Sequence, residues 1–213
     1  LNLPKQFSRL NYLLEKTTIL KHLSLKDCNL KYIPIIPKTV QFLTLSENQI
    51  FSLKERISTI PTLEVLSVAY NQITEIPDEL ESLKLLQELN LSNNKISAVK
   101  DSPFTSMASL VTLNLASNQL KEIEFTLADI PTLEVLVLSN NGIEILPENF
   151  FHEDSNLAYL HLSNNPLKEI SSSISELKEL IKLDLRSTKI KNLPFSMKDL
   201  YNLKTLNLEN NIM

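Results

Sequence analysis

The chain has 213 residues, one glycine, one cysteine and a formal net charge of −4, with seven Lys and Arg against two Asp and Glu in residues 1–40 and an acidic excess in the remainder. This composition excludes a glycine-rich phosphate loop and an internal disulfide framework, and the apolar runs are too short to span a bilayer. A basic start and an acidic body also argue against nucleic acid as the main ligand, because phosphate binding needs a continuous basic face.

One phrase recurs nine times along the chain, first at residues 20–30 and last at residues 203–212. Its shared frame is L-x-x-L-x-L-x-x-N-x-L, and successive copies are 20 to 24 residues apart. A fixed period of this size indicates stacked structural units, none of which can bury its apolar face alone.

This frame resembles that of the leucine-rich repeat family, over nearly the whole chain. The resemblance implies an α/β fold, a curved right-handed solenoid with a concave parallel sheet and short helices, 3₁₀ turns or extended segments on its convex side. It also implies a scaffold that binds a partner protein through the concave face, in immune-type or signalling recognition. We expect no catalytic activity, cofactor or metal. The alternative is the targeting arm of a longer catalytic or signalling protein.

Residues 1–19 precede the first frame and are expected to be a partial upstream repeat or an improvised cap. Leu3 to Leu10 matches the convex half of a repeat whose strand is missing, and the residues after it suggest a longer first helix. Residues 20–213 are expected to form the nine-repeat solenoid, with an incomplete last repeat that ends at Met213. Both ends are therefore expected to be cut from a longer array.

Apolar and polar residues alternate within each frame, which predicts a short strand with one buried face. Leu89 and Leu91 are expected to point into the core, and Asn90 between them to point out. Pairing of nine such strands gives a parallel sheet roughly 40 Å long.

The ninth frame position is expected to turn inward where each strand ends. An amide there both donates and accepts hydrogen bonds, so repetition predicts a polar ladder. Its members are Cys28, Asn48, Asn71, Asn94, Asn118, Asn141, Asn165, Thr188 and Asn211. Cys28 is expected to be a buried structural thiol and, with Thr188, one of the two looser rungs, because each offers fewer hydrogen bonds than Asn.

The remainder of each repeat is expected to return along the convex side. The segments after Pro77 and Pro194 predict a short helix or 3₁₀ stretch, whereas the two prolines of residues 33–40 predict an extended connection. Phe104 and Phe150 replace Leu, as is common in the typical, largely extracellular subclass of the family. This resemblance favours an extracellular or cell-surface location, and the lone cysteine favours the cytoplasm.

Specificity must come from the outward positions of the strands. Two groups of apolar or aromatic residues occur there, in repeats 2–3 and in repeats 6–7, and we predict that they contact a partner protein. The first group is Phe42, Val65 and Tyr70, and the second is Val135, Val137, Tyr159 and His161. The alternative is that Val and Tyr merely suit strands.

His161 and Asp184 share the fifth frame position in adjacent repeats, and Ser163 follows closely. A shallow sheet has no evident oxyanion hole, so we expect a surface contact between His161 and Asp184 and no catalytic triad. A nearby carboxylate is expected to raise the pKa of His161.

Overall fold

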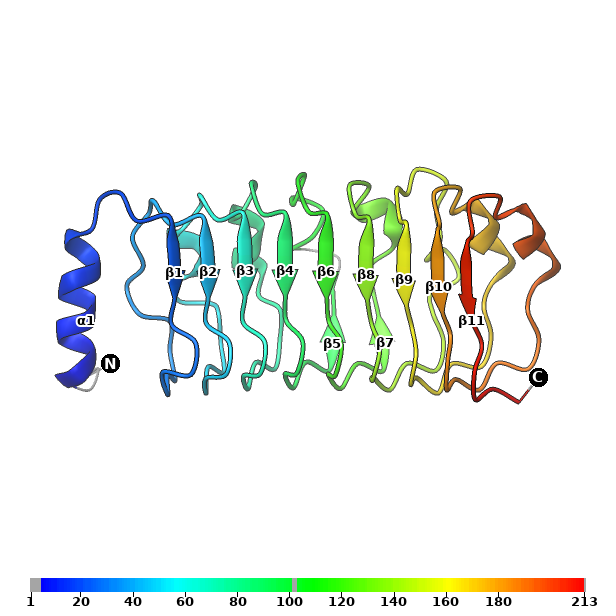
Figure 1. Ribbon diagram of the computed structural model, residues 1–213, viewed down its shortest axis with the longest axis horizontal. Helices are drawn as coiled ribbons and strands as arrows, with labels where there is room; N and C mark the ends of the chain where they lie inside the picture. Colours follow the sequence, from blue (N-terminus) through cyan, green and yellow to red (C-terminus); the bar gives the residue numbers. More distant parts are fainter. Residues whose placement is uncertain (1–4, 101–102, 213) are drawn as a thin grey trace.

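In the computed structural model, which describes residues 5–100 and 103–212, the chain forms an elongated solenoid built on one parallel sheet (Figure 1). The sheet has nine strands in the order β1-β2-β3-β4-β6-β8-β9-β10-β11. Their bounds are β1 His22–Ser24, β2 Phe42–Thr44, β3 Val65–Ser67, β4 Glu88–Asn90, β6 Thr112–Asn114, β8 Val135–Val137, β9 Tyr159–His161, β10 Lys182–Asp184 and β11 Thr205–Asn207. The predicted nine-strand parallel solenoid is confirmed.

The register of the sheet aligns identical frame positions in every pair of strands. Leu43 is opposite Leu66, and Leu113 is opposite Leu136, so equivalent residues form straight rows across the molecule. The strands keep one length although the repeats differ in length, so the extra residues are accommodated in the connections. The inward leucines of the central repeats are completely buried.

In the described part of the chain, five short 3₁₀ helices lie on the opposite side of the solenoid from the sheet (Figure 1). They are η1 Ile57–Thr59, η2 Asp78–Ser82, η3 Leu127–Asp129, η4 Ser172–Glu176 and η5 Phe195–Asp199. Pro77 and Pro194 immediately precede η2 and η5, as the sequence predicted. Residues 33–40 contain no helix, which agrees with the extended connection expected there.

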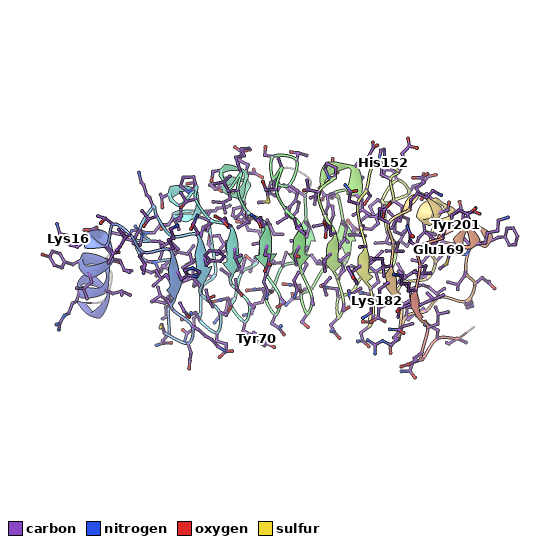
Figure 2. All side chains as sticks on the ribbon, turned by 45° about the horizontal axis from the view of Figure 1, so that its top comes forward. Lys16, Tyr70, His152, Glu169, Lys182 and Tyr201 are labelled. Atoms are coloured by element: carbon purple, nitrogen blue, oxygen red, sulfur yellow. The ribbon has the colours of Figure 1, made fainter. Side chains whose placement is uncertain are left out.

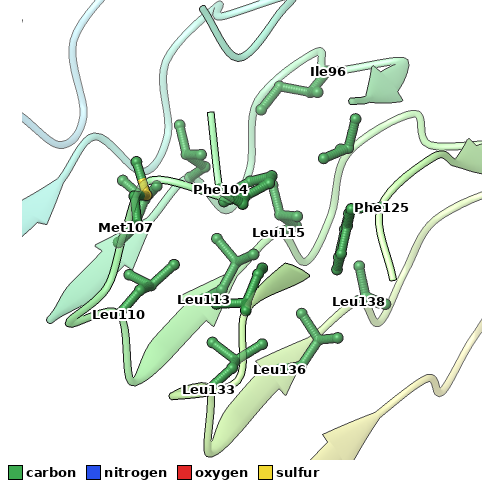
Figure 3. Packing of buried hydrophobic residues seen from close by; sticks show 14 of the residues in the cluster. Ile96, Phe104, Met107, Leu110, Leu113, Leu115, Phe125, Leu133, Leu136 and Leu138 are labelled. Carbon is green, nitrogen blue, oxygen red and sulfur yellow. The ribbon is translucent and has the colours of Figure 1, made fainter. Parts of the chain in front are cut away.

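Aromatic rings form a second layer of the core beneath the central strands. The ring centroids of Phe104 and Phe125 are 5.3 Å apart (Figure 3). Those of Phe125 and Phe150 are 6.0 Å apart. A separate two-stranded parallel sheet pairs β5 Ala98–Val99 with β7 Glu122–Ile123. Neither Phe125 nor this small sheet was predicted.

The helix α1, Lys5–Lys16, covers the end of the solenoid next to β1 (Figure 1). Leu14 is buried, and the Asn11 side-chain oxygen accepts a hydrogen bond from the Ile35 backbone N–H at 3.1 Å. Residues 1–4 of the expected partial repeat, and Met213, lie outside the described residues. In the part that is described, no helix is both long and apolar enough to cross a membrane.

The asparagines of the ninth frame position bond to the turns on both sides. The Asn71 side-chain N–H groups donate to the carbonyls of Leu45 and Val68 at 2.9 and 3.0 Å, and its oxygen accepts from the Ile50 N–H at 2.9 Å. The same three contacts recur at Asn48, Asn94, Asn118, Asn141, Asn165 and Asn211. Each asparagine thereby joins two repeats.

Cys28 differs from this pattern, and the prediction of a buried thiol was wrong. The side chain is exposed, and its Sγ makes a contact with the Lys26 carbonyl at 3.4 Å. The reason is that β1 is an edge strand, so no preceding turn covers the thiol. Thr188 is buried, and its hydroxyl lies 3.1 Å from the Leu185 carbonyl and 2.6 Å from the Asn211 side-chain oxygen.

A second polar ladder, not predicted from the sequence, runs along the edge where the strands begin. A Thr or Asn immediately before the first frame position donates to a backbone carbonyl of the preceding repeat. The Thr132 hydroxyl, for example, donates to the Leu110 carbonyl at 2.8 Å. The other members are Thr39, Thr62, Asn156 and Asn202. These five residues therefore bond neighbouring repeats to each other at the edge opposite the asparagine ladder.

Candidate protein-binding surface

The first predicted group contains two neighbouring residues and one that lies apart. Phe42 and Val65 are opposite each other on β2 and β3, and both are half-buried. Tyr70 lies beyond the end of β3, at the lower edge of the molecule in Figure 2, and is 57% exposed. The His22 ring stacks on Phe42 at 4.3 Å and extends this group. His22 could have been included, because it shares the third frame position with Phe42.

Tyr70 occupies the turn that follows each strand, at the eighth frame position. Its φ is 55°, in the left-handed region, and the eighth residue of every other repeat also has a positive φ. Asn and Asp tolerate this region better than other side chains with a Cβ, and a bulky side chain there is uncommon. Tyr70 therefore presents its ring at the surface from a backbone conformation that is energetically unfavourable for this residue type.

The second predicted group lies on two adjacent strands. Val135 is opposite Tyr159, and Val137 is opposite His161, so the four residues form a square on β8 and β9. Tyr159 is 39% exposed, and the other three residues are half-buried. We call these four residues the β8–β9 patch.

A tightly held charge borders the β8–β9 patch. Asp184 on β10 is opposite His161 and only 1% exposed. The Arg186 guanidinium donates to its two carboxylate oxygens at 2.9 and 2.7 Å, and the Arg186 backbone N–H lies 3.2 Å from the first of them. Burial opposes ionisation, but these hydrogen bonds outweigh it and hold the pKa of Asp184 below its ordinary value. Arg186 was not predicted from the sequence.

His161 contacts Asp184 as predicted, but its pKa does not shift in the predicted direction. Its Nδ1 is 3.8 Å from the nearer Asp184 oxygen. Burial of the ring and the positive charge of Lys182 nevertheless lower the pKa of His161, and the attraction of Asp184 only partly opposes them. The prediction of a raised pKa was therefore wrong, because it left out the burial of the ring and the charge of Lys182.

The side chains around His161 do not form a catalytic relay. The Ser163 hydroxyl donates to the Ser139 hydroxyl at 2.9 Å, so its proton is used in a bond between two strand ends. Ser163 is also buried. Across residues 5–100 and 103–212, no three His, Cys, Asp or Glu side chains gather closely enough to hold a metal ion.

Two sequence profiles match the chain. One described as "Leucine rich repeat" matches residues 84–143 and 131–190, and one described as "Leucine Rich repeats (2 copies)" matches residues 61–105. No curated protein matches the chain.

Solved structures of repeat proteins superpose on it. A leucine-rich repeat protein of Leptospira interrogans is 28% identical with a TM-score of 0.82, over 95% of this chain and 58% of that one. An internalin of Listeria monocytogenes is 25% identical with a TM-score of 0.67, over 90% and 53%. A chain from an octameric complex of latrophilin 3, Unc5D and the leucine-rich repeats of FLRT2 is 23% identical with a TM-score of 0.76, over 86% and 58%. This chain thus spans little more than half the length of each.

Proposed function

The chain belongs to the leucine-rich repeat family, and on that premise we propose that it is a recognition scaffold that binds a partner protein through its concave sheet. The fold commonly mediates protein–protein recognition, and the family and its structural neighbours are typically non-catalytic scaffolds. A neighbour that carries such repeats, FLRT2, is part of an octameric complex with latrophilin 3 and Unc5D, which supports a protein as the class of partner. Immune-type or signalling recognition outside the cell is the setting we propose.

The β8–β9 patch is the observation that carries this proposal. Two valines, a tyrosine and a histidine are contiguous on adjacent strands and point away from the core. Buried aromatic anchors surrounded by apolar contacts dominate the affinity of many protein interfaces. Tyr159 is suited to that role because its ring is apolar and its hydroxyl can bond to a partner.

The surface beyond the ends of β8 and β9 has no long side chains that would block a partner. Ser139 and Ser163, two residues beyond Val137 and His161, are buried and bonded to each other, so no long side chain rises there. Asp184 and Arg186 then form a polar border on the β10 side. An apolar centre with a polar rim is the usual arrangement of a protein interface.

Affinity capture with purified protein, followed by mass spectrometry, tests the proposal. Proteins captured by the parent should be lost with Val137→Asp, because a carboxylate in the β8–β9 patch would be desolvated on binding. The control is Thr205→Asp, which places the same charge on β11, away from the patch. Equal capture by the parent and by Val137→Asp would remove the β8–β9 patch from the interface.

A targeting arm of a longer catalytic or signalling protein is the alternative function. The same surface would make the contacts, so the capture experiment is unchanged, and the solved relatives are longer than this chain. The two functions differ in whether a catalytic domain belongs to the same polypeptide.

A further inference from the structure

A groove crosses the concave face at the edge where the strands begin, which is the upper edge in Figure 1. Its volume is about 480 Å³, and its apolar lining residues, which we call the floor, are Val111, Ala158 and Ile181. These residues immediately precede β6, β9 and β10, and Glu134 holds the same place before β8. The groove therefore lies across four neighbouring repeats.

The groove exists because Ala158 has the shortest side chain in its row. The other residues at the second frame position are Lys21, Gln41, Glu64, Gln87, Val111, Glu134, Ile181 and Lys204. The backbone around Ala158 follows the same ladder as in other repeats, with its N–H donating to the Glu134 carbonyl at 2.9 Å. The short side chain of Ala158 in this row leaves a hollow between Glu134 and Ile181.

The side of the groove is fixed before any partner binds. Thr132 and Asn156 line it and belong to the second polar ladder. The Thr132 hydroxyl donates to the Leu110 carbonyl, and the Asn156 side chain donates to the Pro131 carbonyl, both at 2.8 Å. A preformed site loses less entropy on binding than a site that must be ordered.

Two carboxylates border the apolar floor. Glu134 and Glu179 both line the groove and are exposed, and neither side chain makes a hydrogen bond or ion pair with the described residues. Two lysines lie near Ile181. Lys182 is the next residue in the chain, and Lys204 holds the same frame position in the next repeat. Neither of them lines the groove. The groove thus combines an apolar floor with unpaired negative charge.

We propose that this groove binds a lysine or arginine side chain of the partner protein. Its aliphatic stem would cover Val111, Ala158 and Ile181, and its charged head would pair with Glu134 and Glu179. Long basic side chains commonly bury their stems in this way, and pairs between a cation and a carboxylate form strong hydrogen bonds. An acidic side chain would meet two like charges, and an apolar one would leave both carboxylates without a partner.

The inference rests on the proposed function, because the groove adjoins the β8–β9 patch. Tyr159 follows Ala158, and Val135 follows Glu134, so one partner segment can reach both surfaces. The inference adds the chemistry of the partner: a basic side chain next to an apolar or aromatic one. Charge complementarity of this kind selects between partners and registers more than it adds affinity.

A phage-displayed library of random peptides is the probe that tests the groove. Peptides are selected on the parent protein and those that also bind Ala158→Gln are removed. Gln already occupies the second frame position at Gln41 and Gln87, so this variant fills the groove with a side chain that the row accepts. The peptides that depend on the groove should be enriched in Arg and Lys over the unselected library.

Neutralising the border should then weaken these peptides. Glu134→Gln with Glu179→Gln is expected to reduce their affinity about tenfold, and citrulline in place of arginine, or acetyl-lysine in place of lysine, should do the same. The matched control, Glu55→Gln with Glu81→Gln, changes the net charge equally away from the concave sheet and should leave affinity unchanged. An unchanged affinity in the Glu134 and Glu179 variant overturns the proposal.

The outcomes separate this inference from the proposed function. Groove-dependent peptides without enrichment in Arg and Lys would overturn the inference. Peptides that depend on Tyr159 but never on Ala158 would uphold the concave binding surface and also overturn the inference. Peptides that depend on neither would overturn both.

Discussion

At the residue scale, neighbouring cationic and imidazole side chains on the concave face compete for the same carboxylate. Arg186 donates three hydrogen bonds to the Asp184 carboxylate. His161 lies 3.8 Å from the same carboxylate, and the positive charge of Lys182 acts on its ring. The frame position of each residue can be read from the sequence, and it shows which residues of neighbouring strands are adjacent. It does not show which partner a carboxylate takes, because that depends on side-chain reach and burial.

The pKa of His161 is expected to lie below its ordinary value of about 6.5. Lys182→Met should raise it, whereas Asp184→Asn should lower it further. Because the folded state binds this proton less readily than the unfolded state, the free energy of unfolding should fall as the pH drops through the unfolded-state pKa. NMR titration of the imidazole measures the shift, with Lys204→Met as the control. A pKa at or above the ordinary value would contradict this account.

Tyr159→Ala should weaken binding of a partner protein by about 1 kcal/mol or more, because buried aromatic residues carry much of the affinity of an interface. The melting temperature should barely change, since the ring points away from the core. Isothermal titration calorimetry measures the affinity, and Tyr201→Ala removes an exposed tyrosine outside the strands as the control. Equal affinities of the parent and the Tyr159 variant would exclude this residue from the interface.

Tyr70→Asn should stabilise the fold by up to about 1 kcal/mol, because Asn tolerates the left-handed backbone better. Four other repeats already have Asn at this position: Asn93, Asn140, Asn164 and Asn210. Chemical denaturation measures the gain, and Tyr201→Asn, outside the left-handed region, should show none. A loss of stability in the Tyr70 variant would show that the ring makes contacts that outweigh its backbone strain.

At the scale of elements, the strands were predictable throughout, whereas the connections were predictable only in part. The 3₁₀ segments after Pro77 and Pro194 and the extended residues 33–40 were expected, but the pairing of β5 with β7 was not. The strands follow a two-residue alternation in a fixed frame, so Leu89, Asn90 and Leu91 reveal their orientation directly. The connections vary in length and have no frame, and the pairing of β5 with β7 joins segments 24 residues apart. Phe125 belongs to the aromatic layer for the same reason: only the packed connections bring it between Phe104 and Phe150.

The asparagine ladder gives a test at this scale. Asn118→Ala should lower the free energy of unfolding by about 1–3 kcal/mol, because it leaves the Ile96 N–H and the Leu91 and Leu115 carbonyls without these partners. Cys28→Ala changes the equivalent position of the first repeat, where the side chain is exposed, and should cost much less. Urea denaturation compares the two. If both variants lose a similar amount of unfolding free energy, the hydrogen bonds of the asparagine ladder do not account for the loss at Asn118.

At the scale of the whole molecule, each repeat contacts only its neighbours, so stability is a sum over repeats and their interfaces. The fourth frame position shows the consequence. Leu113 in the centre is fully buried, whereas Leu206 on the edge strand β11 is 38% exposed.

Leu113→Ala should therefore cost about 2–5 kcal/mol, the usual range for removing a buried leucine side chain. Leu206→Ala should cost clearly less, although the frame position and the substitution are the same. Guanidinium denaturation followed by circular dichroism measures both. Equal losses would mean that β11 is as well packed as the centre.

The alternation within each strand also separates the residues that can vary during evolution from those that the framework requires. Nine strands of three residues present eighteen outward side chains in two rows, and all of them except the buried Asp184 are at least partly exposed. Drift at these sites can alter the ligand while the leucines and asparagines keep the framework unchanged. One scaffold can thus acquire new specificities by small steps, each of which leaves a foldable intermediate.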